Sequence, residues 1–466
     1  MFRTAVVLLA ATLSAQQLEF EVAKPLALTG ATVHTGDGGT PIANAVVLLR
    51  DGRIEAVGPA ADVHVPEGYK VVDAEGRHVT PGLIDTHVHY SQTGWADGRP
   101  DAANVRKDHP YELAMAENAA HPERFHRAFL HSGVTAVFDV GGYPWTRLLG
   151  AATEDDPLAP HVAATGALLA TFDPGLSLPD QSQFVFPKSP DDGRSLVRSH
   201  AAWGSKAIKV WLIPTPEHPL SEWEPIVLAI GEAAREADLP LVVHATTLDT
   251  AALAVRAGAH LLVHSVEDQE VDDAFVAALR EHETFYCPTL TVRRGYAQLY
   301  ARQLSDEVRR QLDDVHPSIK KRVLATEQLP QDPRMNARAI EAMNKRLELQ
   351  DAIMARNLMR VHQAGVPVVL GTDAGNPLTL HGPSVFVELE AMQADGMKAS
   401  AVLVAATRDA ARAMGRGDDL GRIEPGYIAD LLVLEEDPSR DVRAFRSVSH
   451  VIRAGHMHAR ASLLPR

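Results

Sequence analysis

Short apolar runs alternate with helical stretches through the middle of the chain, between about residues 81 and 407. Apolar runs that recur between amphipathic segments are typical of parallel β-α-β units. Because there are eight runs, we predict an α/β fold in which eight parallel strands close into a TIM (β/α)8 barrel. The runs occupy residues 82–89, 134–140, 161–170, 207–212, 240–246, 260–266, 284–292 and 366–374.

Both ends of the chain show a different pattern, in which short strands are separated by turns. Strands are predicted at residues 26–33, 45–50, 53–57 and 71–73, with Asp51-Gly52 as a hairpin turn, and again at 429–434 and 448–454. Since chain termini usually lie close together, we expect residues 16–79 and 408–466 to form one small composite β-sandwich domain.

The barrel would then span residues 80–407, which is longer than the roughly 250 residues of a minimal barrel. Insertions are therefore required. The largest is a charged, helical segment at about 293–364, and its pattern fits either a lid or a packing helix pair.

The first 15 residues resemble a signal peptide. Met1-Phe2-Arg3 precedes an apolar run at 4–13, and Ser14-Ala15 is the candidate cleavage site. This predicts a periplasmic or secreted protein; if the segment is instead a disordered start or a first strand, the protein is cytoplasmic. The run is too short to span a bilayer, and no later segment reaches about 18 uninterrupted apolar residues, so we expect no stable membrane insertion.

Composition narrows the partners and the chemistry. With 45 Lys and Arg against 60 Asp and Glu, the net charge is −15, which disfavours nucleic acid as a partner and leaves a small molecule. The single cysteine, Cys287, excludes an intramolecular disulfide framework and a thiolate metal cluster. Any metal must therefore be held by nitrogen and oxygen ligands, and the chain has 22 histidines to supply them. The composition leaves a homo-oligomer open.

Polar side chains recur where barrel active sites gather, at the C-terminal ends of the predicted strands. The first run ends in His87 and His89, which are two residues apart and therefore face the same side of a strand. The other runs contribute Lys209, His244, His264 and Asp373.

Each of these residues has an ordinary structural explanation when taken alone. A single histidine is more often a core residue than a ligand, Asp373 could cap a helix, and Lys209 could extend to the barrel mouth. Their occurrence together at five strand ends favours a site for divalent ions, which accept such nitrogen and oxygen ligands. An ammonium would repel the ions, so Lys209 must be neutral or modified.

These residues carry a resemblance to the amidohydrolase superfamily, on the branch of imidazolonepropionase-related proteins and prolidase-type dipeptidases. The matching segments are residues 79–89, 139–142, 371–375 and 420–430, together with Lys209, His244 and His264.

The resemblance implies two divalent ions, with zinc the usual occupant. By that pattern His87, His89 and Asp373 hold the first ion, His244 and His264 hold the second, and N6-carboxylated Lys209 bridges both. It also implies that a hydroxide bridging the metals is the nucleophile and that Asp373 is the general base, later the proton donor to the leaving nitrogen.

Substrate contacts are less strongly indicated. Tyr286, Arg293 and Arg294 could meet a carbonyl oxygen and a carboxylate, although a core position for Tyr286 and a solvated helix start for the arginines are equally ordinary. His381 matches a recurrent family histidine and could orient substrate or shape its loop. The segment 211–216 replaces the Ser/Gly-rich loop of dipeptidase-like members, which predicts an altered pocket floor.

The resulting prediction is a hydrolase of a C–N bond in a small amide, with an N-acyl amino acid or a dipeptide as default substrate. One alternative is a mononuclear deaminase, but residues 245–248 lack the glutamate that such enzymes place after the fifth strand. A hydrolase of cyclic amides or lactones and a non-catalytic binding protein on the same scaffold are the others.

Overall fold

The computed structural model describes residues 24–466, and the predicted signal peptide lies outside this range. Strands and helices are mixed along the described chain, which confirms the α/β prediction. Among these residues no helix is long and apolar enough to cross a membrane.

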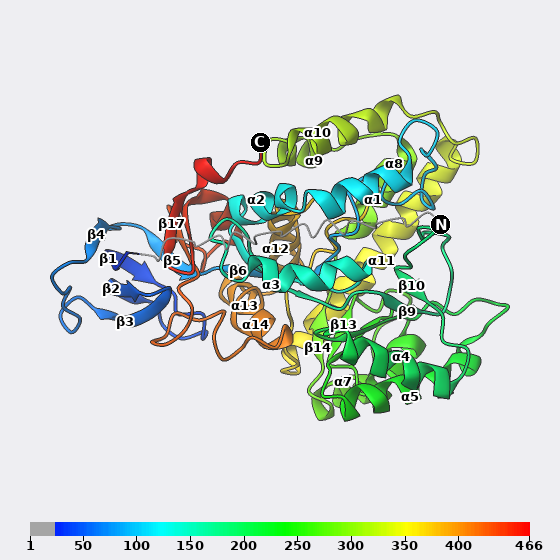
Figure 1. Ribbon diagram of the computed structural model, residues 1–466, viewed down its shortest axis with the longest axis horizontal. Coiled ribbons are helices and arrows are strands. Elements are labelled where there is room, and N and C mark those ends of the chain that lie inside the picture. The colour runs from blue at the N-terminus through cyan, green and yellow to red at the C-terminus, as the bar shows by residue number, and fades with distance from the viewer. Residues whose placement is uncertain (1–23) are drawn as a thin grey trace, which may run out of the picture.

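Strands from both chain ends form one eight-stranded sheet, in the order β17-β16-β15-β5-β1-β2-β3 with β4 paired to β1. In Figure 1 the blue N-terminal strands lie beside the red C-terminal strand β17 at one end of the molecule. The link between the two ends is β15, which pairs with β5 antiparallel. The strands are β1 (Leu26–Val33), β2 (Ile42–Arg50), β3 (Arg53–Pro59), β4 (Lys70–Asp73), β5 (His78–Pro81), β15 (Leu431–Leu434), β16 (Val448–Arg453) and β17 (His456–Ala459).

Local sequence explains much of this sheet. Asp51 and Gly52 join β2 to β3 with φ values of 50° and 76°, the left-handed pair that a tight hairpin turn needs, so the hairpin prediction is confirmed. Alternate residues of β1 enter different clusters, with Leu28 in one and Ala27 in another. The sheet is therefore covered by apolar side chains on both faces.

The middle of the chain contains parallel strands in two sheets, β6-β7-β8 and β10-β9-β11-β12-β13-β14. Seven of the eight predicted runs contain a strand, and the third run is divided between β8 and β9. These strands are β6 (Leu83–Val88), β7 (Val134–Asp139), β8 (His161–Ala164), β9 (Leu168–Ala170), β10 (Phe184–Val185), β11 (Ile208–Trp211), β12 (Leu241–His244), β13 (Leu261–Val263) and β14 (Phe285–Cys287).

The eighth predicted run forms no continuous strand. It makes isolated parallel bridges instead, from Val368 to Tyr286 of β14 and from Ala374 to Val88 of β6. Asp373, with φ 63°, takes the backbone out of the extended conformation at the end of this run. The segment still lies between the last and the first parallel strands, because its bridges reach both of them.

Helices fill the connections. The part of the chain predicted as a helical insertion contains α8 (Val292–Ala301), α9 (Asp306–Gln311), α10 (Pro317–Leu324) and the long α11 (Ala337–Gln363). The other helices are α1 (Tyr111–Ala120), α2 (Glu123–His131), α3 (Leu149–Thr153), α4 (Pro190–Ala202), α5 (Leu220–Glu236), α6 (Leu248–Arg256), α7 (Asp273–Glu281), α12 (Ser384–Ala394), α13 (Ala399–Ala405) and α14 (Arg408–Ala413).

Helix α14 packs with the parallel strands, although residues 408–466 were expected to join the terminal sheet. Ala410 and Ala411 of α14 pack in the same buried cluster as Ile84 and Ala136 of the parallel strands. Residues 408–413 therefore belong with the parallel strands, although the sequence pattern had grouped them with the terminal sheet.

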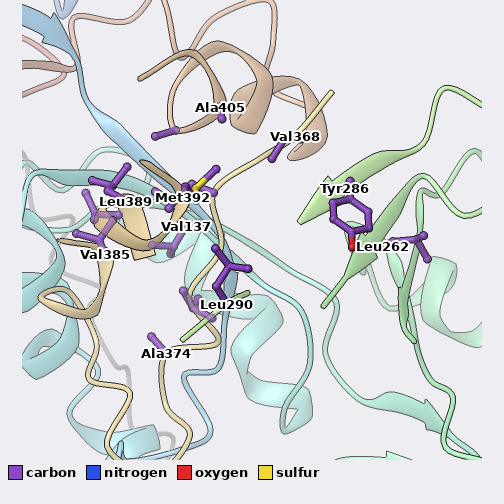
Figure 2. Packing of buried hydrophobic residues seen from close by; sticks show 14 of the residues in the cluster. Val137, Leu262, Tyr286, Leu290, Val368, Ala374, Val385, Leu389, Met392 and Ala405 are labelled. Carbon is purple, nitrogen blue, oxygen red and sulfur yellow. The ribbon is translucent and has the colours of Figure 1, made fainter. Parts of the chain in front are cut away.

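The main apolar core lies between the parallel strands and their helices. Figure 2 shows Leu262 and Tyr286 of neighbouring strands in this cluster, together with Val385, Leu389 and Met392 of α12. The core fixes the strands, and the polar residues at their C-terminal ends are thereby held in place.

Candidate active site

His87 and His89 converge on one carboxylate. His89 lies just beyond β6, and its Nε2 atom is 2.9 Å from Oδ1 of Asp373. Nε2 of His87 is 3.3 Å from the same oxygen. All three side chains are buried. The fold therefore brings the His-x-His pair together with Asp373, which lies nearly 300 positions later in the chain.

The remote ring nitrogens fix how these imidazoles point. Nδ1 of His89 donates to the carbonyl oxygen of Gly141, 2.7 Å away, and Nδ1 of His87 lies 3.1 Å from the hydroxyl of Thr289. With Nδ1 engaged, Nε2 of each ring faces Asp373. This is the arrangement that a metal-binding histidine needs.

His244 and His264 form the other half of the cluster. They end β12 and follow β13, and their ring centroids lie 4.4 Å apart. The ring of His264 is also 4.9 Å from that of His87, and its Nε2 is 3.8 Å from Oδ2 of Asp373. Burial lowers the pKa of His244 and His87 well below 6.5 and that of His264 to about 4, so their neutral, ligating forms are favoured.

Lys209 of β11 is buried at the same place, and its Nζ atom has no hydrogen-bond partner among residues 24–466. An unpaired buried ammonium is costly. Burial correspondingly lowers the pKa of Lys209 to about 7. At neutral pH a substantial fraction of this side chain is therefore an uncharged amine without a partner, which suits a group that is to be modified.

Asp373 is held tightly despite its left-handed backbone. Its N–H donates to the carbonyl of His87, 2.7 Å away, and Nδ2 of Asn376 donates to its Oδ1 at 2.6 Å. Burial alone would raise the pKa of Asp373, but the surrounding imidazoles of His87, His89 and His264 hold it well below 3.8. The carboxylate is therefore ionised at neutral pH.

The carboxylate of Asp85, which the sequence did not indicate as a site residue, joins the first of the eight apolar runs to the last. Oδ2 of Asp85 accepts a hydrogen bond from the Thr372 hydroxyl at 2.6 Å, and its Oδ1 accepts from the backbone N–H groups of Thr372 and His87. Asp85 thus ties the His-x-His segment to the residue before Asp373. Its position two residues before His87 was the available signal.

A cavity of about 250 Å³ opens above these groups. It is lined by all six proposed ligands and by further residues that the sequence did not indicate. The latter include Gln92, Arg99, Gln183, Glu267, Tyr296 and Asn376, while Trp211 belongs to the segment 211–216 that was expected to alter the pocket floor. Only Asn376 had a sequence signal, since it follows Asp373 by three residues.

Three of the missed residues form one hydrogen-bond network with the carboxylate. Oδ1 of Asn376 accepts from Nη1 of Arg99 at 2.6 Å and from the hydroxyl of Tyr296 at 2.5 Å. These donors fix the side-chain amide so that its Nδ2 faces Asp373. Arg99 also makes a two-pronged pair with Asp101.

The predicted substrate residues divide into one that reaches the cavity and three that do not. Arg293 lines it, paired with Glu267. Arg294 points away and pairs with Asp351 at the surface, with 65% of its side chain exposed, because successive helical residues face different directions. These contacts keep it outside the cavity, and its substrate role stays a prediction.

Tyr286 is also not a cavity residue. It is a fully buried member of the core (Figure 2), and its hydroxyl accepts from the backbone N–H of Val266, contacts that do not support a substrate role. His381 lies behind the site: its Nε2 donates to the carbonyl of His89 and its ring stacks on Phe125, with centroids 4.0 Å apart. Of its two predicted roles, shaping the loop is the one these contacts fit.

The sequence matches the model of the amidohydrolase family over residues 78–457, a stretch that contains every side chain of the cluster. The chain belongs to the amidohydrolase family. The recognition made from the motifs is therefore confirmed, and so is the prediction of a hydrolytic enzyme.

Named relatives of this amidohydrolase span most of its length. It is 27% identical to an imidazolonepropionase of Xanthomonas campestris pv. campestris (strain 8004), over 88% of this chain and 92% of the relative. It is 25% identical to an ochratoxinase of Aspergillus niger, over 91% and 84%. A solved structure of a prolidase from Bifidobacterium longum, described as putative, covers 94% of this chain and 95% of its own with a TM-score of 0.68 at 24% identity, so the two share a fold.

Proposed function

We propose that this amidohydrolase is a binuclear metal-dependent enzyme that hydrolyses an amide bond in a small molecule. The substrate that we expect is an N-acyl amino acid or a dipeptide. The observation that carries the proposal is the convergence of four histidines, one ionised aspartate and one unpaired lysine at a single buried cavity. The proposal includes a closed (β/α)8 barrel as the scaffold and the terminal sheet as a separate domain.

The side chains fit two divalent ions. His87, His89 and Asp373 would hold the first ion, and His244 and His264 the second. The unpaired Nζ of Lys209 fits a bridging ligand if its lone pair attacks the carbon of CO2 and the nitrogen releases one proton. The product is a carbamate anion, which removes the charge conflict between an ammonium and two cations. Zinc accepts such a ligand set.

When bound, such ions would lower the pKa of a water molecule and polarise the scissile carbonyl. Asp373 supplies the proton transfer: its ionised carboxylate takes the proton from the attacking water and returns it to the departing nitrogen. Asn376, fixed by Arg99 and Tyr296, holds Oδ1 of Asp373 in place during both transfers.

The cavity supports a small substrate. Its volume of about 250 Å³ lies at the lower limit of small-molecule pockets, which begin at roughly 300 Å³. Two buried or half-buried guanidinium groups, Arg99 and Arg293, line it, and each is already matched by a carboxylate partner. A guanidinium carries five N–H donors, so each can still donate to a carboxylate on the substrate, which is what an N-acyl amino acid or a dipeptide offers.

A hydrolase of cyclic amides or lactones is the second candidate. It is favoured by the match to the imidazolonepropionase, which covers 88% of this chain. The non-catalytic alternative has less support, since all six ligand positions carry ligating residues and converge.

The test is a substrate screen on protein loaded with zinc and bicarbonate, using dipeptides, N-acyl amino acids, cyclic amides and lactones. General acid–base catalysis contributes about 100- to 10,000-fold, so Asp373→Asn should lower kcat by at least about 100-fold while the fold is retained. Unchanged turnover by that variant would contradict the assigned base.

A second variant tests the bridging lysine. Lys209→Ala should reduce the zinc content and the rate, and a short-chain carboxylic acid should restore part of both by replacing the carbamate. Lys206→Ala is the matched control, because Lys206 is an exposed lysine three residues earlier. If Lys209→Ala and Lys206→Ala bind the same amount of metal, the bridging assignment is wrong.

A further inference from the structure

A second group of metal-ligating side chains lies in the terminal sheet, in a different part of the fold from the cavity. Nε2 of His34 is 3.1 Å from Nδ1 of His78 and 3.7 Å from Oδ1 of Asp437. Nδ1 of His78 is 3.9 Å from the same oxygen. Three potential ligand atoms therefore form a small triangle.

The dimensions of this triangle match a tetrahedral ion. Zinc bonds of about 2.0–2.2 Å place neighbouring ligand atoms roughly 3.3–3.6 Å apart. The observed separations of 3.1, 3.7 and 3.9 Å bracket that range. They are also close to the 2.9–3.8 Å separations between histidine nitrogens and Asp373 in the barrel cavity.

The three residues come from adjacent strands of both chain ends. His34 directly follows β1, His78 begins β5, and Asp437 follows β15 by three residues. In the sheet order β15 pairs with β5 and β5 with β1, and Leu434 lies opposite His78. A ligand shared by all three would join residues separated by about 400 positions in the sequence.

The surroundings favour a neutral, preset ligand set. Burial is the main cause that lowers the pKa of His34 to about 4, so its imidazole is neutral at neutral pH. The backbone N–H and hydroxyl of Ser439 donate to Oδ1 of Asp437 and orient the carboxylate, while its Oδ2 meets only the exposed Arg440. The side chains of His78 and Asp437 are 18% and 26% exposed, which leaves a solvent-facing position for a fourth ligand, a water molecule.

We propose that His34, His78 and Asp437 form a zinc site that fastens the C-terminal part of the terminal sheet to its N-terminal part. Two imidazoles and one carboxylate are ligands that zinc accepts, and three protein ligands with one water complete four-coordination. The site is separate from catalysis and does not depend on the proposed function. The alternative is a hydrogen-bonded His34–His78 pair beside the Asp437 carboxylate that binds no metal.

The test measures zinc in untagged full-length protein after dialysis against micromolar zinc sulfate. His78→Gln should hold about one zinc equivalent less than wild type, and Asp437→Asn should show the same loss. His450→Gln is the matched control, because His450 lies on β16 of the same sheet outside the triangle. It should bind as much zinc as wild type.

Thermal unfolding supplies an independent readout. Zinc should raise the Tm of wild type and of His450→Gln by a few degrees more than that of His78→Gln or Asp437→Asn, since an ion that binds only the folded sheet stabilises it. Equal zinc content in wild type and both site variants would overturn the proposal.

The same design keeps this inference distinct from the catalytic one. If the barrel cavity holds no metal, wild type should still contain one equivalent that His78→Gln lacks. If only the terminal site fails, Lys209→Ala should still lower the metal content while His78→Gln does not. Should His78→Gln fold poorly, Asp437→Asn decides the outcome, because Asp437 lies in a partly exposed loop.

Discussion

Glu388 of α12 offers the sharpest test of how the site is supported. Its carboxyl group is fully buried and accepts three hydrogen bonds from the segment that follows β14. The donors are the N–H of Leu290 at 2.6 Å, the N–H of Thr291 at 3.1 Å and the hydroxyl of Thr291 at 2.8 Å. This segment begins with Thr289, whose hydroxyl contacts Nδ1 of His87, so Glu388 positions a histidine that it does not touch.

The expected loss of stability follows from the backbone N–H donors that would lose their acceptor. A buried donor left without a partner costs about 1–3 kcal/mol. Glu388→Ala removes the acceptor of a fully enclosed N–H at Leu290 and a part-buried one at Thr291, so we expect a local destabilisation of about 2–4 kcal/mol. Glu388→Gln keeps one carbonyl oxygen and should cost about 1–2 kcal/mol.

Hydrogen–deuterium exchange of the peptide covering residues 288–292 measures this directly. At about 1.4 kcal/mol per tenfold, exchange should accelerate roughly 30- to 700-fold in Glu388→Ala and about 5- to 30-fold in Glu388→Gln. Glu390→Gln is the control, because Glu390 lies two residues later on the same helix and pairs with Arg446 at the partly exposed surface. Wild-type exchange rates in Glu388→Ala would refute the reasoning.

Three further outcomes are expected. Arg293→Gln should lower kcat/KM for the substrate that the screen identifies, whereas Arg294→Gln, which alters a side chain outside the cavity, should leave kcat/KM within about twofold. Burial lowers the pKa of His126 to about 4, so its neutral ring stabilises the fold above pH 6.5. This contribution is lost as the pH falls from 6.5 through 4. His126→Gln should therefore flatten the fall in Tm measured over that interval. Gly371→Ala would place a Cβ 2.4 Å from Sγ of Cys287. We therefore expect the variant to lose about 1–3 kcal/mol of stability. An unchanged Tm would count against the packing at the end of the eighth run.

The sequence was sufficient for the parts of the molecule that depend on local periodicity. Seven of the eight apolar runs contain observed parallel strands, and the Asp51-Gly52 dipeptide predicted the hairpin. The eighth run was the exception, because Asp373 turns the backbone into the left-handed region and only bridges remain. The apolar composition of this run indicates that it is buried. A strand and an irregular buried segment are both apolar, so composition alone does not distinguish them.

The candidate ligands could be predicted for a related reason. They lie at strand ends, and parallel strands bring their C-terminal ends to one place whatever the loops do. A residue such as His264 is therefore assigned to the site by its position in the chain. The family motif then supplied the roles that geometry alone left open.

Only the tertiary structure decided which other side chains reach the cavity. Arg99 lies in a loop and Tyr296 lies on a helix of the insertion. Both hydrogen-bond to Asn376, which is 277 residues from Arg99 and 80 from Tyr296. No periodicity fixes the path of a loop or the rotation of a helix, so Arg293 and Arg294 looked equivalent in sequence until α8 turned one inward and the other to solvent. The meeting of His34, His78 and Asp437 has the same origin, because strand pairing between the two chain ends brings them together.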